Sequence, residues 1–146
     1  MSDLKLAIAS DHAGWEAKEV LSRYLKGKGY EVKDFGTNSP ESVDYPDYAH
    51  VLARAIENNE YDYGIALCAS GNGISMTLNK HQKIRAALCW NVEIAEFARR
   101  HNNANICALP GRFIPADEAI KIVDKFINTG FDGGRHERRV NKIPIN

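Results

Sequence analysis

The residues best suited to chemistry are a cysteine and the glycine-rich loop that follows it. Cys68 ends the apolar run Tyr63–Cys68, and Ala69-Ser-Gly-Asn-Gly73 comes directly after it. Two glycines let the backbone point several N–H groups the same way beside a helix start, an arrangement that binds phosphate or a developing oxyanion. A thiol beside such donors deprotonates readily, so Cys68 is a candidate base or nucleophile. A structural turn and a buried core cysteine are the alternatives that these residues alone leave open.

Three further polar clusters could contribute to the same site. Asp11-His12 follows an apolar run, where it could orient a substrate hydroxyl or cap a helix. His101-Asn102 could supply an acid/base group with an amide holder, or be polar residues at a helix end, and its position relative to Cys68 depends on the fold or on a partner. Arg135 and Arg139 are four residues apart, which places them on one face of a helix, as a phosphate clamp requires.

Several common motifs are excluded by neighbouring residues. No Gly-Lys-Ser/Thr follows the glycine loop, and Met76 stands where a dinucleotide fingerprint needs its third glycine. A low-molecular-weight phosphatase needs arginine six residues after its cysteine, where this chain has Ile74. The three cysteines are far apart, without CxxC, and the five histidines show neither HxxxH nor HExxH. We therefore predict neither a disulfide scaffold nor a metal site.

The elements that must position these residues are short apolar runs alternating with segments of helical period. This alternation predicts βαβ units and one doubly wound parallel sheet of five strands. Ligands of such sheets bind beyond the carboxyl ends of the strands. The predicted strands cover residues 4–10, 30–35, 63–68, 84–89 and 105–109, and the predicted helices cover 14–28, 46–59, 74–79, 91–100 and 115–128.

Length and composition restrict the class of protein. The chain has 146 residues, enough for one domain, which we predict to span residues 1–146. A formal net charge of zero argues against general binding to nucleic acid or to anionic membranes. No apolar run has the length of a membrane span or the position of a signal peptide, so we expect a cytoplasmic protein. Residues 130–146 differ, because basic residues outnumber acidic ones there, and we expect this extension to dock on a partner subunit.

Taken in order along the chain, these residues resemble the type B ribose-5-phosphate isomerase family, which includes the galactose-6-phosphate isomerase subunits. Each matching segment is short, but their order and spacing together are highly specific and cover nearly the whole chain. The segments are Ser10-Asp-His-Ala-Gly14, Asp44-Tyr-Pro46, Cys68-Ala-Ser-Gly-Asn-Gly-Ile-Ser75, Asn79-Lys80, Ile84-Arg-Ala86, Arg100-His-Asn-Asn103, Pro110-Gly-Arg112 and Gly133-Gly-Arg-His136 with Arg139.

The resemblance implies an α/β fold, a Rossmann-like three-layer α/β/α sandwich with active sites at a dimer interface. It also implies interconversion of an aldose phosphate and a ketose phosphate, without metal, nucleotide or other cofactor. Cys68 resembles the base that moves a proton between C2 and C1, and His101 resembles the acid that opens the furanose ring. The implied substrate-binding residues are Asp11, His12, Tyr45, Ala69, Ser70, Gly71, Asn72, Gly73, Asn102, Arg112, Arg135 and Arg139.

Some branches of this family use a carboxylate just after the glycine loop as the base. This chain reads Ile74-Ser75-Met76 there, which favours the cysteine. Ribose 5-phosphate is the expected substrate, and allose 6-phosphate or galactose 6-phosphate is the alternative. A protein that binds a phosphate or nucleotide without turnover is the alternative from another class. We expect a homodimer, with a tetramer as the further possibility.

Overall fold

Five parallel strands form one sheet in the computed structural model, which describes residues 3–145. The strand order is β2-β1-β3-β5-β4, so the chain reverses its direction of winding beside β1. The prediction of a five-stranded parallel sheet is confirmed. The strands are β1 Lys5–Ser10, β2 Glu31–Asp34, β3 Tyr63–Cys68, β4 Ala86–Leu88 and β5 Ile106–Pro110.

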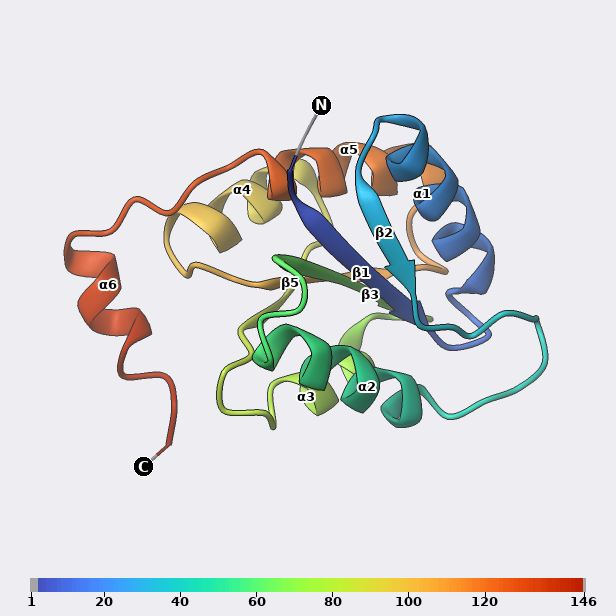
Figure 1. The fold of residues 1–146 in the computed structure, drawn as a ribbon, viewed down its shortest axis with the longest axis horizontal. Helices are drawn as coiled ribbons and strands as arrows, with labels where there is room; N and C mark the ends of the chain where they lie inside the picture. The colour runs from blue at the N-terminus through green and yellow to red at the C-terminus, as the bar shows by residue number, and fades with distance from the viewer. Residues whose placement is uncertain (1–2, 146) are drawn as a thin grey trace.

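Helices cover both faces of this sheet (Figure 1). Helices α1 (Trp15–Gly27), α4 (Val92–Arg100) and α5 (Ala116–Ile127) pack on one face. Helices α2 (Tyr45–Glu57) and α3 (Asn72–Leu78) pack on the other. The short α6 (Arg135–Val140) stands apart from these three layers, beyond the end of α4 (Figure 1).

Side-chain size differs between the two faces of the sheet. In β1, Leu6 and Ile8 face the α1, α4 and α5 layer, whereas Ala7 and Ala9 face α2 and α3. Successive side chains of a strand point to opposite faces, so this alternation is set by the sequence. Cys68 shares its face with the alanines, and its side chain therefore lies on the side of α2 and α3.

Element boundaries differ from the sequence-based ones by one to a few residues, most of all at the fourth strand. We expected 84–89, but the strand is Ala86–Leu88. The backbone N–H of Ile84 bonds the carbonyl of His81, and that of Arg85 bonds the side chain of Asn105. These turn contacts remove both residues from the strand. Among the described residues, no helix has the length and apolar character needed to cross a membrane.

Candidate functional site

Cys68 lies at the carboxyl end of the central strand β3, where the glycine loop begins. Its side chain is buried, with 5% of the residue's surface exposed. Two backbone bonds tie this end to the end of β5: the N–H of Gly111 donates to the carbonyl of Cys68, and that of Arg112 donates to the carbonyl of Ala69. The thiol therefore sits in a rigid corner between two strand ends.

The loop Ala69–Gly73 turns sharply at Gly71. Gly71 has φ +79°, in the left-handed region, and a Cβ there would lie 2.4 Å from Leu88. Gly73 has a different requirement, because its Cβ would lie 2.5 Å from the ring of Tyr45, at the start of α2. Both glycines thus allow close approach, and the loop brings Tyr45 against the first turn of α3. The hydroxyl of Ser70 accepts a hydrogen bond from the N–H of Asn72 within the turn.

Asp11 and His12 follow β1 at the same edge of the sheet. Asp11 is buried, and its Oδ1 accepts hydrogen bonds from the backbone N–H groups of Ala13 and Gly14, which shape the turn into α1. The N–H of Val43 donates to Nδ1 of His12 over 3.1 Å. His12 and Arg112 both line a cleft of about 280 Å³ at this edge.

The loop that carries Val43 is held by a buried lysine. Lys18 is fully buried on α1, and its Nζ lies 2.6 Å from Oδ2 of Asp34, the last residue of β2. Oδ1 of Asp34 in turn accepts from the N–H of Gly36. Because a buried charge is retained only with a partner, this pair fixes the start of the loop that ends at Val43.

His101 and Asn102 lie at the opposite edge of the sheet. His101 follows α4, which runs back toward the amino ends of the strands, and it precedes Ile106, the first residue of β5. Cys68 pairs instead with Pro110, the last residue of that strand. At roughly 3.3 Å per residue, the strand alone separates the two positions by about 13 Å. Within one chain, Cys68 and His101 therefore do not form one site.

Arg135 and Arg139 lie on α6, beyond the end of α4 (Figure 1), the helix that His101 directly follows. The helix that their spacing required is present. The rings of His101 and His136 stack, with centroids 4.2 Å apart and planes 9° apart. Desolvation, followed by the positive charges of His101, Arg135 and Arg139, lowers the pKa of His136. This edge thus concentrates positive charge around two imidazoles.

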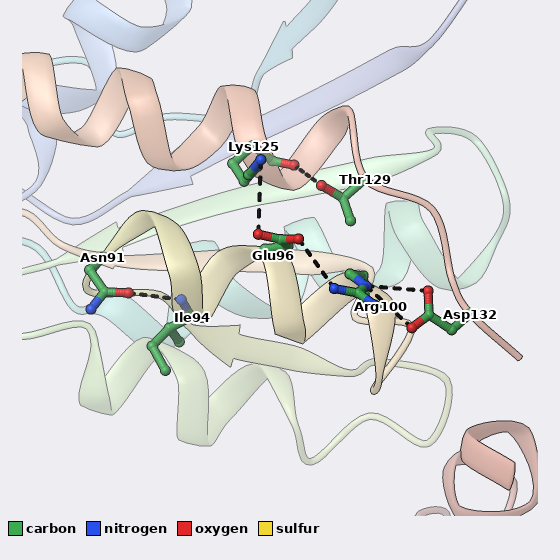
Figure 2. Close-up of polar contacts among 7 residues, drawn as sticks. All are labelled: Asn91, Ile94, Glu96, Arg100, Lys125, Thr129 and Asp132. Carbon is green, nitrogen blue, oxygen red and sulfur yellow. Dashed lines mark hydrogen bonds and ion pairs between the residues drawn. The ribbon is translucent and has the colours of Figure 1, made fainter.

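The segment between α5 and α6 is anchored to α4 (Figure 2). The N–H of Asp132 donates to the carbonyl of Arg100, and the Asp132 carboxylate lies 3.2 Å from Nε of Arg100. Arg100 and Lys125 of α5 both pair with Glu96 (Figure 2). These contacts place α6 next to the end of α4 before any partner is present.

One group of side chains at this edge has the composition of a metal site. His101, Asp132 and His136 each offer a ligand atom, and these atoms lie within 4.8 Å of one another. Two histidines and a carboxylate suit zinc by ligand type. The guanidinium of Arg100 already binds Asp132, and Arg135 adjoins His136, so positive charge opposes a divalent cation there.

The structure divides the predicted site residues into two groups. The first gathers at the carboxyl edge of the sheet and comprises Asp11, His12, Tyr45, Cys68, Ala69, Ser70, Gly71, Asn72, Gly73 and Arg112. The second gathers at the amino edge and comprises His101, Asn102, Arg135 and Arg139.

Val43 and His136 also contact predicted site residues, although neither was among the residues predicted for the site. A backbone donor such as Val43 leaves no signal in residue type, whereas His136 directly follows Arg135 in a segment that carries the family resemblance.

Comparison with known proteins gives one consistent result. The family described as Ribose/Galactose Isomerase matches residues 6–143. The chain is 40% identical to ribose-5-phosphate isomerase B of Escherichia coli over 139 residues, covering 95% of this chain and 93% of that protein.

Two solved structures of relatives are also similar along their whole length. A ribose 5-phosphate isomerase from Thermotoga maritima superposes with a TM-score of 0.97 at 57% identity, covering 98% of this chain and 99% of that one. Ribose-5-phosphate isomerase B from Mycoplasma genitalium was solved with bound ribulose-5-phosphate. It superposes with a TM-score of 0.92 at 41% identity, covering 98% of this chain and 95% of that one. With its fold, its glycine loop and these matches in agreement, the chain belongs to the ribose/galactose isomerase family.

Proposed function

We propose that the protein interconverts ribose 5-phosphate and ribulose 5-phosphate through an enediolate. The observation that carries the proposal is that Cys68, the glycine loop and the cleft lined by His12 and Arg112 all lie at the carboxyl edge of the sheet. The family membership supports an aldose–ketose isomerase. A proton α to a carbonyl is weakly acidic, so the base must be close and the developing charge must be stabilised as it forms.

In this mechanism the thiolate of Cys68 takes the proton from C2 of the open-chain aldose. Negative charge then develops on the C1 oxygen, where the backbone N–H groups of the loop Ala69–Gly73 stabilise the enediolate. The same sulfur returns the proton to C1. The hydroxyl proton of O2 passes to the C1 oxygen, so that C1 becomes an alcohol carbon and C2 becomes the carbonyl carbon. Because Oδ1 of Asp11 is used in the turn, we assign substrate contact to its Oδ2.

Ring opening and phosphate binding fall to the residues at the other edge, donated by a second copy of the chain. His101 acts as the ring-opening acid, with Asn102 beside it. Arg135 and Arg139 bind the dianionic phosphate and thereby fix the position of C1 and C2 against the base. Since Cys68 and His101 lie at opposite edges of one sheet, each complete site needs two chains.

Exposed apolar side chains support burial against a second copy. Phe113, just after the cleft residue Arg112, is 72% exposed, and Trp90 at the start of α4 is 56% exposed. Removing such side chains from water against a second chain would be favourable. We therefore propose a homodimer, or a tetramer built from it, in which the extension 130–146 of the single domain 1–146 docks on the partner.

The protein is proposed to act in the cytoplasm without cofactor or metal. Its three cysteines, Cys68, Cys89 and Cys107, are all free thiols, which suits a reducing compartment.

The test is an assay of ketose formation from ribose 5-phosphate, allose 6-phosphate and galactose 6-phosphate, with a chelator present. We expect fast turnover of the pentose, unaffected by the chelator, and its loss in Cys68→Ala with sugar-phosphate binding retained. Cys107→Ala is the matched control, since it removes a buried sulfur from the neighbouring strand β5 outside the site. Preference for a hexose phosphate would keep the mechanism and change the substrate. Binding without turnover of any of the three would contradict the proposal.

A further inference from the structure

The turn that follows His101 is held by two arginines that the mechanism above does not use. Nη1 of Arg99 donates to Oδ1 of Asn103 over 3.0 Å and to the carbonyl of Ala104 over 2.6 Å. Nε of Arg85 donates to the carbonyl of Asn103 over 2.8 Å. Asn103 has φ +48°, in the left-handed region, so the turn adopts a conformation that most residues disfavour. Both guanidiniums thus fix the backbone just after His101.

Arg99 also holds the beginning of the tail. Its Nε donates to the carbonyl of Thr129 over 3.1 Å, at the end of α5. The Thr129 hydroxyl donates to the carbonyl of Lys125, which closes that helix (Figure 2). Three residues after Thr129, Asp132 is bound to Arg100, the neighbour of Arg99. One side chain therefore joins the His101 turn to the segment that leads into α6.

The surroundings of Arg99 are unusual for a cation. The residue is 5% exposed, and its guanidinium lies 4.7 Å from the ring centroid of Tyr63 and 5.8 Å from that of Phe126. All its hydrogen-bond acceptors given above are neutral carbonyl or amide oxygens, and within residues 3–145 it has no carboxylate in ion-pair range. Burial lowers its pKa.

A buried cation without a counter-ion is a poor device for stability alone. Apolar side chains of similar volume often stabilise such positions equally well or better. Arginine differs from them by offering several donors in a fixed plane, which can hold separate segments at set angles. The arrangement around Arg99 uses that property, because its acceptors come from the His101 turn and from the end of α5.

We infer that Arg99 is a positioning residue of the shared active site. Its guanidinium holds the His101 turn and the start of the tail in one arrangement, so that the ring-opening acid and the phosphate-binding arginines reach the partner's Cys68 together. This inference rests on the proposed function, in which each site combines two chains. It predicts that Arg99 acts only in the chain that donates His101, and not in the chain that supplies Cys68.

The first experiment is steady-state kinetics of Arg99→Lys, which keeps the charge but loses the planar set of donors. A misplacement of about 1 Å can lower a rate by about 100-fold, so we expect a fall of at least tenfold in kcat/KM. Because both ring opening and phosphate binding are affected, kcat should fall and KM should rise. The matched control is Arg54→Lys on the exposed face of α2, which should behave as the wild type. Wild-type kinetics in Arg99→Lys would overturn the inference.

The second experiment separates positioning from a general loss of fold. Chains carrying Arg99→Lys and Cys68→Ala are co-expressed with different tags, and the hybrid dimer is purified. One of its two sites then combines an intact Cys68 with a His101 turn held by an intact Arg99. By two-fold symmetry, we expect about half the activity of the wild-type dimer. An inactive hybrid would show that Arg99→Lys damages its own chain as a whole, and would overturn the inference.

A parallel hybrid of Cys68→Ala with His101→Asn tests the shared site itself. It should also recover about half of the wild-type activity. If this hybrid is active and the Arg99 hybrid is not, only the inference about Arg99 fails. If neither recovers, the two-chain site of the proposed function fails, and the inference fails with it.

Discussion

The imidazole of His12 is held in a single tautomer by the backbone of a distant loop. Because the N–H of Val43 donates to Nδ1, the neutral ring must carry its proton on Nε2. The side chain can then donate from Nε2 to an oxygen of the substrate. The tautomer is thus set by the backbone N–H of Val43, and not by His12 itself.

Two substitutions of His12 separate acceptance of the Val43 hydrogen bond at Nδ1 from donation to the substrate at Nε2. In His12→Gln the amide N–H₂ lies where Nε2 was, so the donor to the substrate is kept and the Val43 bond is lost. In His12→Asn the amide oxygen can replace Nδ1, so the Val43 bond is kept and the donor is lost. We expect kcat/KM to be at least about tenfold higher for Gln than for Asn, in line with the typical value of a hydrogen bond to a charged group. Equal activity of both variants in steady-state assays would contradict this assignment.

The titration of His136 is a second expectation at this scale. Desolvation and the neighbouring positive groups lower its pKa below the usual value of about 6.5. At pH values between the lowered pKa of the folded chain and the usual pKa of the unfolded chain, the folded chain binds fewer protons than the unfolded chain. In that range His136 therefore makes the free energy of unfolding rise with pH. In an NMR titration, Arg139→Gln should raise the pKa of His136, whereas Arg23→Gln on the exposed face of α1 should leave it unchanged. A pKa of His136 above 6.5 in the wild type would exclude this electrostatic account.

Among the elements, the turn between β3 and α3 has the strictest requirement on residue type. Gly71 combines φ +79° with a Cβ position 2.4 Å from Leu88. A non-glycine residue in the left-handed region costs about 1–3 kcal/mol, and the close contact adds to it. Gly71→Ala should therefore lower the free energy of unfolding by at least this amount, as measured by urea denaturation.

Gly27, the last residue of α1, is the matched control for Gly71. A Cβ there meets nothing within 4 Å, and its φ is not positive. Gly27→Ala should raise stability by roughly 0.4–1 kcal/mol, because it restricts the unfolded chain. A lower free energy of unfolding for Gly71→Ala together with a higher one for Gly27→Ala would support the strict requirement for glycine at position 71. An unchanged free energy of unfolding for Gly71→Ala would refute it.

The order of strands and helices could be predicted because each strand is a short apolar run between segments of helical period. The helix predicted for 91–100 is present, and Oδ1 of Asn91 accepts a hydrogen bond from the N–H of Ile94 at its start (Figure 2). The start of β4 was harder to predict, since Arg85 is removed from the strand by a long-range contact with Asn105.

The candidate site was predictable in part for the same reason. Residues at the end of a strand or just after it, such as Cys68 and His12, lie at the carboxyl edge of any parallel sheet. The position of His101 depends instead on the direction of α4 and on the turn at Asn103. The hydrogen bonds of Arg85 and Arg99 join residues distant in the sequence, and nothing in the residue types alone announces them.

For the whole molecule, the proposed division of catalysis between Cys68 of one chain and His101 of another would make activity depend on association. On this proposal a single chain holds no complete site, so a dissociated chain should be inactive although it remains folded. Specific activity should therefore fall on dilution, while circular dichroism stays unchanged. Addition of excess Cys68→Ala protein should restore turnover, because hybrids contain one complete site, whereas serum albumin should not. Constant activity per chain at concentrations where sedimentation shows only monomers would contradict this.

The proposed site, with half of its residues at each edge of one sheet, also has a consequence for gene duplication. In a duplicated gene, one copy could lose the residues of the carboxyl edge and the other those of the amino edge. Each product alone would be inactive, but the pair would retain one site. Both genes would then have to be kept, and the interface between their products would come under selection for unlike over like pairing. A sheet that presents its catalytic groups at both ends thus offers a direct route from a homomeric enzyme to an obligate heteromer.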